Sequence, residues 1–369
     1  MQIQAAVAWE REKPFSIETV ELDEPRDDEI LVRIKAVGLC HTDLMVRDVD
    51  TGLGMNLPAV LGHEGSGVVE RVGASVRKVK VGDHVALSFM SCGTCRNCQE
   101  GRPAYCTTMA PLNFCGRRCD GSATMRAGQE ELAANFFGQS SFATFALTHE
   151  RNTVVVPRDA PLEIVGPLGC GIQTGAGAII NSLACEAGSS LLVVGGGSVG
   201  LSAVLAGVVQ GCSPIIIVEP HEARRRLALD LGGTHAIDPG AGDIAAAVRA
   251  IVPEGVRYAF DTSGRDEAIE GAIGALGVLG AIALVAGSGL PTQRLPATIP
   301  AIVGGALTIK GVIEGSSDPD TFIPYMLRLH REGKFPFERL IKTFPFADIN
   351  KAVEAQHRGE AVKVVLMMP

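Results

Sequence analysis

The chain has 369 residues, of which 46% are hydrophobic and 20% charged, so it is a globular protein rather than a disordered one, and its length suits two domains. Its formal net charge of −8 argues against a nucleic-acid partner, because phosphate binding needs a basic face. The sequence shows neither a basic-then-apolar signal segment nor an apolar run long enough to cross a bilayer. We therefore expect a cytoplasmic protein without a membrane partner, whose ten cysteines stay thiols or bind metal.

The first 150 residues have the pattern of a β-rich domain. Residues 1–22 alternate apolar and polar side chains, as a strand entering a hairpin does. Apolar side chains also recur at every second position of residues 29–38, which is the period of a half-buried strand. Residues 65–87 combine short apolar runs with glycine-containing turns. These patterns predict a sheet-based domain.

Four cysteines gather in one short loop over residues 92–106. Cys92, Cys95 and Cys98 form a C-x-x-C-x-x-C run that Cys106 follows, and four thiolates can enclose a tetrahedral zinc ion without leaving an open position. An iron–sulfur cluster, paired disulfides and four unligated thiols are the alternatives. We favour structural zinc, because a reducing compartment disfavours disulfides and the loop has little apolar material to hold it together.

The pattern changes between residues 172 and 312. Apolar runs at 191–195, 215–219, 258–261 and 281–286 alternate with helical stretches. Such alternation is typical of a parallel sheet that is covered by helices on both faces. The predicted fold class is therefore α/β, with a β-rich domain and a doubly wound parallel-sheet domain. The last segment, from residue 313, could return to the first domain, which these patterns alone do not settle.

A dinucleotide-binding motif lies between the first of these strands and the helix that follows it. Gly195, Gly197 and Gly200 have the G-x-G-x-x-G spacing that lets the backbone approach a pyrophosphate at a helix N-terminus. Glu219 ends the next apolar run, where a carboxylate accepts a hydrogen bond from the ribose and repels a 2′-phosphate. We therefore expect NAD rather than NADP, and we interpret the arginines at 224–226 as a solvated helix face from which one reaches the ribose.

Three further metal ligands are scattered through glycine-rich segments. Cys40 lies in GLCHTD, His63 in GHEG and Cys170 in GPLGCGIQTG. Together they would make a catalytic zinc site with two thiolates, one imidazole and an open fourth position. Spacing alone leaves this a hypothesis, because a lone cysteine or histidine more often packs in a core. Cys115 and Cys119 form a C-x-x-x-C pair that we interpret as spare thiols.

Taken together, these motifs resemble the zinc-dependent medium-chain alcohol dehydrogenases over essentially the whole chain. The segments NFCGRRCDGS, FFGQSSFATFAL and GKFPFERLIKTFPF look like the benzyl-alcohol (aryl-alcohol) dehydrogenase branch of that family. The resemblance implies a GroES-like catalytic domain over residues 1–171, completed by 313–369, and a Rossmann NAD-binding domain over 172–312. It also implies an active site in the cleft between them and a homodimer or homotetramer.

The resemblance also assigns roles around one catalytic and one structural zinc ion per chain. Thr42 matches the hydroxyl that hydrogen-bonds the substrate oxygen, Asp43 the carboxylate that orients His63, and Glu64 an acid beside the metal. One position departs from the pattern: Met45 stands where many members have the histidine that ends a proton relay, and a thioether carries no proton. The terminal proton acceptor is therefore not identified.

For the coenzyme, the resemblance places His41 and Lys363 at the pyrophosphate and Arg224 near the adenosine ribose. The implied reaction moves hydride between NAD and aromatic or allylic primary alcohols, such as benzyl alcohol, and is reversible. The alternatives are a glutathione-dependent formaldehyde dehydrogenase, a general aliphatic alcohol dehydrogenase, and a noncatalytic member of the superfamily. The noncatalytic alternative is disfavoured because every candidate zinc ligand is retained.

Overall fold

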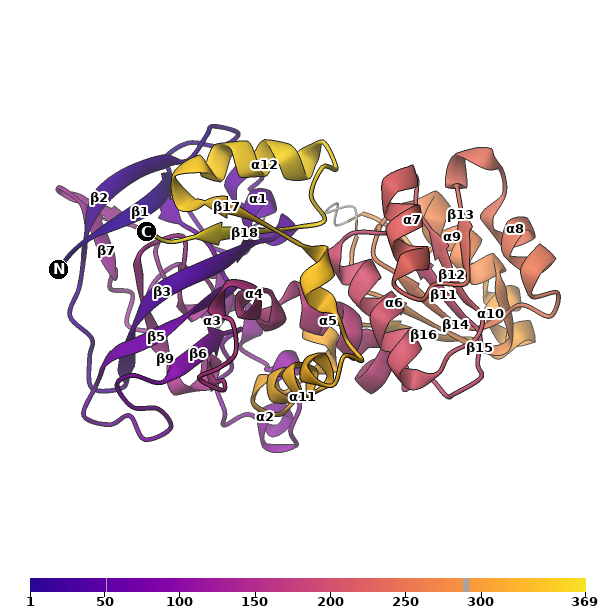
Figure 1. Cartoon of the computed structure of the whole chain (residues 1–369), viewed down its shortest axis with the longest axis horizontal. Helices are drawn as coiled ribbons and strands as arrows, with labels where there is room; N and C mark the ends of the chain where they lie inside the picture. The colour runs from indigo at the N-terminus through magenta and orange to yellow at the C-terminus, as the bar shows by residue number, and fades with distance from the viewer. Residues whose placement is uncertain (51, 288–291) are drawn as a thin grey trace. The chain divides into compact units, whose positions relative to one another are not determined.

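The chain forms two compact units in the computed structural model, which describes residues 1–50, 52–287 and 292–369 (Figure 1). Unit 1 consists of residues 1–171, 318–328 and 340–369. Unit 2 consists of residues 172–317 and 329–339. Residues 340–369 therefore belong to the same unit as the N-terminus. None of the described helices is long and apolar enough to cross a membrane.

Unit 1 is built on two sheets. The first has the order β4-β1-β2-β7-β8 and consists of β1 (Gln2–Ala8), β2 (Ser16–Leu22), β4 (Ala59–Val60), β7 (Met125–Ala127) and β8 (Glu130–Leu132). The strands β1 and β2 pair antiparallel, which is the hairpin that the alternation predicts. The second sheet has the path β10-β6-β5-β3-β18-β17, with β9 also paired to β3. Its strands are β3 (Glu29–Leu39), β5 (Gly65–Val72), β6 (His84–Leu87), β9 (Phe145–His149), β10 (Thr153–Val155), β17 (Ile341–Pro345) and β18 (Lys363–Met367).

The second sheet brings three distant segments to one place. The strand β3 pairs antiparallel with β5 on one side, with Val37 opposite Gly65, and with β18 on the other, with Val364 opposite Leu39. Because β3 ends at Leu39 while β5 begins at Gly65 and β18 at Lys363, the residues flanking these strand ends lie near one another. The backbone pairing therefore determines which side chains meet at this edge.

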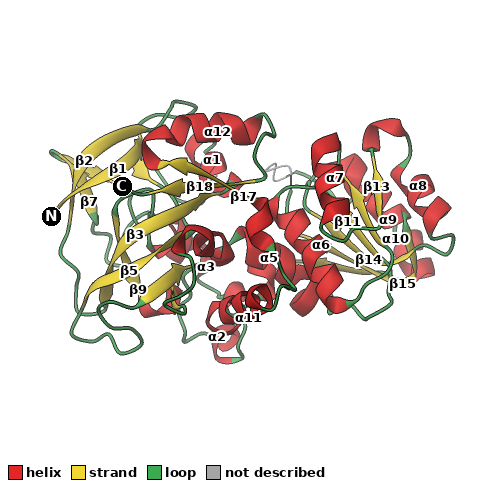
Figure 2. Cartoon of the chain, in the orientation of Figure 1, coloured by secondary structure: helices red, strands yellow, loops and turns green. Residues whose placement is uncertain are grey.

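The α-helices of the described residues range from 4 to 13 residues in length (Figure 2). Those between residues 41 and 177 are α1 (His41–Asp48), α2 (Arg96–Gln99), α3 (Met109–Phe114), α4 (Leu162–Val165) and α5 (Gly171–Gly177). Those that follow are α6 (Ser198–Gln210), α7 (Glu222–Asp230), α8 (Ile244–Ile251), α9 (Asp266–Gly274), α10 (Ile299–Gly305), α11 (Pro319–Arg331) and α12 (Ile349–His357).

Unit 2 contains a parallel sheet of six strands in the order β13-β12-β11-β14-β15-β16. The strands are β11 (Leu191–Val194), β12 (Ile215–Val218), β13 (His235–Ile237), β14 (Val256–Asp261), β15 (Leu276–Leu284) and β16 (Thr308–Gly311). Counted within this sheet, the order is 3-2-1-4-5-6, which is the order of doubly wound dinucleotide-binding folds. The order of the strands changes sense between β11 and β14, and doubly wound folds bind their ligands at such a switch point.

Helices cover both faces of this sheet. On one face, Leu192 and Val194 of β11 pack with Val248 of α8 and Ile273 of α9. On the other face, α6 approaches so closely that a Cβ at Gly207 would lie 2.7 Å from the Leu191 side chain. Burial on both faces explains why these strands are continuous apolar runs rather than alternating ones.

Candidate active site

Four side chains from three distant segments meet in unit 1. The ligand atoms of Cys40, His63, Glu64 and Cys170 all lie within 4.8 Å of one another. Cys40 immediately precedes α1, and His63 and Glu64 immediately precede β5. Cys170 follows the short helical turn Gly166–Gly169. The structure thus brings together the two cysteines and the histidine that sequence analysis selected, and the carboxylate of Glu64, for which the resemblance implied a place beside the metal, lies with them.

Asp43 fixes both the backbone and the imidazole of this cluster. Its Oδ2 accepts the backbone N–H of Cys40 at 2.9 Å, which caps the first turn of α1. Its Oδ1 accepts the backbone N–H of Gly62 at 3.0 Å and lies 2.9 Å from Nδ1 of His63. Because Asp43 engages Nδ1, the other imidazole nitrogen, Nε2, is left as the metal-binding atom.

The cluster has the properties of a zinc site. Nε2 of His63 is buried and has no hydrogen-bond partner in the described part of the chain, an arrangement that costs about 1–3 kcal/mol unless a ligand satisfies it. The pKa of Cys40 lies well below its ordinary value, first because of the hydrogen bond with Cys170 and then, against the effect of burial, because of the charge of His63. Two thiolate donors and one imidazole suit zinc, so the residues fit that ion.

A buried ion pair lies beside the cluster. Nζ of Lys363 is 2.5 Å from Oε2 of Glu64, and it donates to the Leu39 carbonyl at 3.2 Å. Oε1 of Glu64 accepts the Gly171 N–H at 2.9 Å. Burial raises the pKa of Glu64 to about 7, although Lys363 opposes the shift. A Cβ at Gly38 would lie 1.9 Å from Glu64 Oε2, so only glycine leaves room for this carboxylate.

Three other residues of the sequence analysis, His41, Thr42 and Met45, lie in α1, and Lys363 belongs to the ion pair. Oγ1 of Thr42 lies 3.8 Å from Sγ of Cys40, and its side chain is half-buried. His41 is exposed, while Met45 packs against the core of unit 1. Lys363 is only 1% exposed, and its ammonium group forms an ion pair with Glu64. The coenzyme contacts predicted for His41 and Lys363 stay predictions.

The four cysteines of residues 92–106 form a second group of possible ligands, whose sulfur atoms lie within 4.8 Å of one another. The Cys92 and Cys98 sulfurs are 4.0 Å apart, close to the ~3.8 Å that tetrahedral zinc with Zn–S bonds of about 2.3 Å requires. The N–H of Cys95 donates to the Cys92 sulfur at 3.2 Å, and this and other hydrogen bonds lower the pKa of Cys92 to about 5. The N–H of Cys92 donates to the Cys106 sulfur at 3.2 Å. Thiolate-stabilising amides of this kind fit a metal with four sulfur ligands.

The glycine motif of unit 2 joins β11 to α6. Gly195 has a φ of +98°, in the left-handed region that favours glycine. A Cβ at Gly200 would lie 1.8 Å from the Gly195 carbonyl oxygen, so the turn also needs glycine there. Apart from Gly197 itself and its two chain neighbours, no heavy atom of the described residues lies within 4 Å of a Cβ built at Gly197, which precedes α6. An open backbone next to a helix N-terminus fits a pyrophosphate.

Glu219 directly follows β12 and holds the glycine motif. Its Oε2 accepts the N–H of Gly196 at 2.5 Å, and its Oε1 accepts the N–H of His221 at 2.8 Å. The side chain is only 3% exposed, so the carboxylate is held firmly beside the motif. A carboxylate retains lone pairs for a ribose hydroxyl after accepting two hydrogen bonds.

Comparison with known proteins identifies the family of the chain. Residues 26–158 match the family model of the alcohol dehydrogenase GroES-like domain, and residues 198–331 match that of the zinc-binding dehydrogenase. The chain is 48% identical to the geraniol dehydrogenase of Castellaniella defragrans over 99% of this chain and 97% of that protein. The chain belongs to the zinc-dependent medium-chain alcohol dehydrogenase family. The predicted family and fold class, a GroES-like domain with a Rossmann-type parallel-sheet domain, are confirmed.

Two solved structures of the family are similar over the whole chain. The benzyl alcohol dehydrogenase from Acinetobacter calcoaceticus is 43% identical, with a TM-score of 0.95 and 100% of each chain covered. An alcohol dehydrogenase zinc-binding domain protein from Burkholderia ambifaria is 46% identical, with a TM-score of 0.97, and covers 100% of this chain and 99% of its own. The chain is therefore similar to these structures throughout its length.

The arginines of this dehydrogenase at 224–226 do not form one solvated face. Arg226 is exposed and pairs with Glu222 one helical turn earlier. Arg225 instead lies 3.1 Å from Asp238, with a side chain 18% exposed. Arg224 is half-buried, and its Nε has no hydrogen-bond partner within the described residues. Its predicted position near the ribose stays a prediction.

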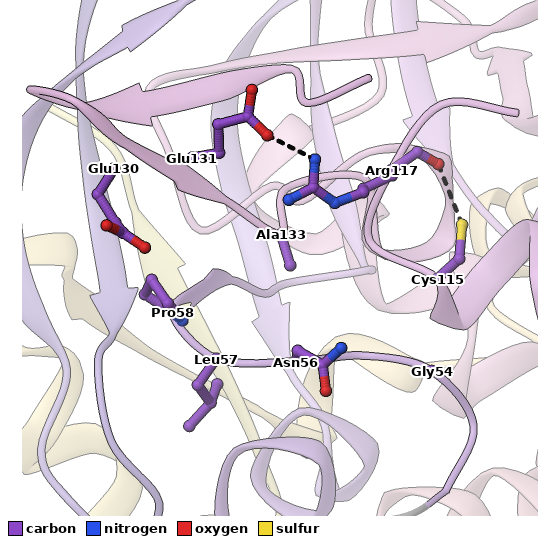
Figure 3. A pocket seen from close by; sticks show the side chains of 9 residues that line it. All are labelled: Gly54, Asn56, Leu57, Pro58, Cys115, Arg117, Glu130, Glu131 and Ala133. Atoms are coloured by element: carbon purple, nitrogen blue, oxygen red, sulfur yellow. Dashed lines mark hydrogen bonds and ion pairs between the residues drawn. The ribbon is translucent and has the colours of Figure 1, made fainter. Parts of the chain in front are cut away.

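The C-x-x-x-C pair belongs to neither ligand group of the described residues. Cys119 is exposed, whereas the Cys115 sulfur donates to the Arg117 carbonyl at 3.0 Å beside a pocket of about 160 Å³ (Figure 3). This pocket contains no candidate zinc ligand, so we do not assign the alcohol to it. Its lining consists of Gly54, Asn56, Leu57, Pro58, Cys115, Arg117, Glu130, Glu131 and Ala133.

Sequence analysis missed one buried residue that holds the zinc-ligand segment. Nε2 of Gln139 donates to the carbonyls of His63 at 2.9 Å and Ser88 at 3.0 Å. Its Oε1 accepts the N–H of Gly65 at 3.1 Å and the hydroxyl of Ser141 at 2.9 Å. The sequence could have indicated this role, because it places a glutamine within a run of aromatic and small residues. A buried amide in such a run must have its hydrogen bonds satisfied.

Proposed function

We propose that the chain is an NAD-dependent dehydrogenase with one catalytic and one structural zinc ion, and that it oxidises aromatic or allylic primary alcohols reversibly to aldehydes. The observation that carries the proposal is the meeting of Cys40, His63 and Cys170 around a buried imidazole nitrogen without a partner. Geraniol and benzyl alcohol, named for two similar proteins, both carry the hydroxymethyl group next to an unsaturated carbon. This shared chemistry supports the substrate class.

In the proposed site, Cys40, His63 and Cys170 hold a zinc ion that supplies a Lewis acid for the alcohol oxygen. Asp43 keeps the imidazole in the tautomer and direction that such a site requires. The Thr42 hydroxyl accepts the alcohol proton in a hydrogen bond. The glycine motif of unit 2 would hold the pyrophosphate of NAD, which would supply the hydride acceptor of the reaction.

The coenzyme preference is tested by Glu219→Gln, which keeps an oxygen for the Gly196 N–H and removes the negative charge. We expect the ratio of kcat/KM for NAD to that for NADP to fall by roughly 10–100-fold, because hydrogen bonds to charged groups contribute about 1.5–3 kcal/mol and the repulsion of a 2′-phosphate disappears. Steady-state kinetics with both coenzymes measures the ratio.

Glu222→Gln is the matched control, since this exposed carboxylate lies only three residues further along and pairs with Arg226. Its coenzyme ratio should equal that of the wild type. A wild-type KM that is lower for NADP than for NAD would show that the assignment of Glu219 is wrong.

The substrate class is tested by initial rates of NAD reduction with benzyl alcohol, an allylic alcohol and short saturated alcohols. We expect kcat/KM to be higher for benzyl alcohol and the allylic alcohol by roughly 10–200-fold, which is the discrimination that a hydrophobic pocket gives per methylene group. Higher activity on S-hydroxymethylglutathione than on benzyl alcohol would instead favour a glutathione-dependent formaldehyde dehydrogenase. A preference for saturated alcohols would favour a general aliphatic enzyme.

Further parts of the proposal come from the resemblance and the composition. They are a catalytic domain of residues 1–171 with 313–369, a coenzyme domain of residues 172–312, assembly as a homodimer or homotetramer, and a cytoplasmic location. Each is independent of the zinc chemistry. Size-exclusion chromatography with light scattering tests the assembly directly.

A further inference from the structure

A buried phenylalanine lies flat on the imidazole of the zinc-ligand histidine. The Phe137 ring stacks on His63 with a centroid distance of 4.4 Å and an interplanar angle of 26°. The neighbouring ring of Phe136 meets the same imidazole edge-on, at 5.3 Å and 88°. Phe137 is 4% exposed and Phe136 is fully buried. Aromatic rings thus contact both the face and the side of the metal ligand.

The backbone of Phe137 has a conformation that a bulky residue rarely adopts. Its φ is +53° and its ψ is 28°, in the left-handed region that is unfavourable for side chains other than those of glycine and asparagine. Ser140, in the same turn, also has a positive φ, of +49°. Such conformations persist only where the surroundings impose them, and they concentrate at functional sites.

Hydrogen bonds with neighbouring residues impose the left-handed backbone conformation of Phe137. Nδ2 of the buried Asn152 donates to the carbonyls of Phe137 at 3.0 Å and Gly138 at 2.9 Å. The Ser140 hydroxyl donates to the Val60 carbonyl at 2.6 Å. The carbonyls of Phe137 and Gly138 and the hydroxyl of Ser140 are therefore each hydrogen-bonded to a residue outside the turn. These bonds maintain the strained backbone conformation of Phe137. The same turn contributes Gln139, which binds the His63 carbonyl.

One degree of freedom of the ligand is otherwise only loosely restrained. Asp43 binds Nδ1 of His63 and so limits where that atom lies. The torsion between Cβ and the imidazole ring is an sp³–sp² torsion, which is broad and only weakly restricted by itself. A ring stacked on the face of the imidazole prevents the tilt that a single hydrogen bond still permits. Stacking and hydrogen bonding together fix the direction of Nε2.

We propose that Phe137 is a positioning residue for the catalytic metal: its left-handed backbone serves to lay the ring on His63, so that Nε2 keeps its direction toward the sulfurs of Cys40 and Cys170. This inference rests on the proposed function, because it requires a metal at that cluster. The alternative is that Phe137 merely fills the core, with the imidazole as one of several neighbours.

Phe114 separates these two interpretations. Its ring meets those of Phe136 and Phe137 edge-on, with centroid distances of 5.7 Å and 5.2 Å. The ring contacts found among the described residues do not include one between Phe114 and His63. Phe114→Leu therefore loosens the same aromatic cluster without removing the ring that touches the ligand.

The experiment uses the full-length enzyme with cobalt(II) exchanged into the catalytic site and zinc kept in the four-cysteine loop. In Phe137→Leu, we expect the visible cobalt absorption to shift and the catalytic metal to leave for a chelator about 10-fold or more faster, since altering the support of a metal ligand typically changes metal affinity 10–100-fold. Phe137→Tyr keeps the ring face and should retain the wild-type spectrum.

Phe114→Leu should also keep the wild-type spectrum and the wild-type rate of metal loss. An unchanged spectrum in Phe137→Leu, or an equal change in both leucine variants, would overturn the positioning role and leave the proposed function intact. A wild-type chain that takes up no metal at Cys40, His63 and Cys170 would overturn the proposed function and this inference with it.

A second pair of variants tests the backbone. Phe137→Gly and Phe137→Ala both remove the ring, but only glycine relieves the left-handed strain. We expect the glycine variant to unfold at a higher temperature than the alanine variant and to lose its metal no more slowly. Equal thermal stability of the two would show that residue 137 does not hold this strained conformation for the sake of its ring.

Discussion

Cys40→Ala is expected to lower kcat/KM for benzyl alcohol by roughly 10⁴-fold or more, because a Lewis-acid contribution of about 6 kcal/mol corresponds to that factor. The variant removes one of the three zinc ligands and leaves His63 and Cys170 without a complete site. It should still fold, since Cys40 is half-buried at the start of α1 and the loss of a cap costs about 1 kcal/mol. Zinc content, circular dichroism and kinetics on the same sample measure the three effects.

The control for this prediction is Cys119→Ala, which removes an exposed thiol that belongs to neither ligand group. It should retain wild-type kinetics and two zinc ions per chain, whereas Cys40→Ala should retain one. Turnover at the wild-type rate in Cys40→Ala, with one zinc ion left, would show that the Cys40 cluster is not the catalytic centre.

The local patterns of the sequence were sufficient for the main strands and for the four-cysteine loop. The runs at 191–195 and 215–219 are apolar throughout because helices cover both faces of their sheet, and they became β11 and β12. The four-cysteine loop is compact in sequence, so its spacing alone indicated that its sulfurs lie together. Cys40, His63 and Cys170 lie far apart in sequence, so their meeting needed the resemblance to a family.

Two supporting features of the site, the Lys363–Glu64 pair and the turn at Phe137, could not be predicted, because they depend on register and backbone conformation. Lys363 meets Glu64 only because β18 pairs with β3 in the register that sets Val364 opposite Leu39. A shift of one residue would turn the lysine to the other face of the sheet. Phe137 gave no signal of a left-handed turn, since sequence rules expect glycine or asparagine there.

Cys95→Ala should instead impair stability before activity. The structural site contributes its metal-binding free energy to folding, and the 92–106 loop has little other burial, since only Pro103, Ala104 and Cys106 are buried in it. We expect Tm to fall by roughly 10 °C, which corresponds to a loss of about 3 kcal/mol for a unit of this size. Differential scanning fluorimetry and the half-life of activity at elevated temperature measure this effect.

At low temperature, the folded fraction of Cys95→Ala should turn over within about threefold of the wild-type rate, because the cluster of Cys40, His63 and Cys170 keeps all its ligands. The two cysteine variants therefore have opposite signatures: one loses turnover with its fold retained, and the other loses thermal stability with its chemistry retained. If Cys95→Ala lost turnover while Tm stayed constant, the loop would be taking part in the reaction. A closed set of four sulfur ligands has no open position for substrate, so that result would contradict the structural assignment.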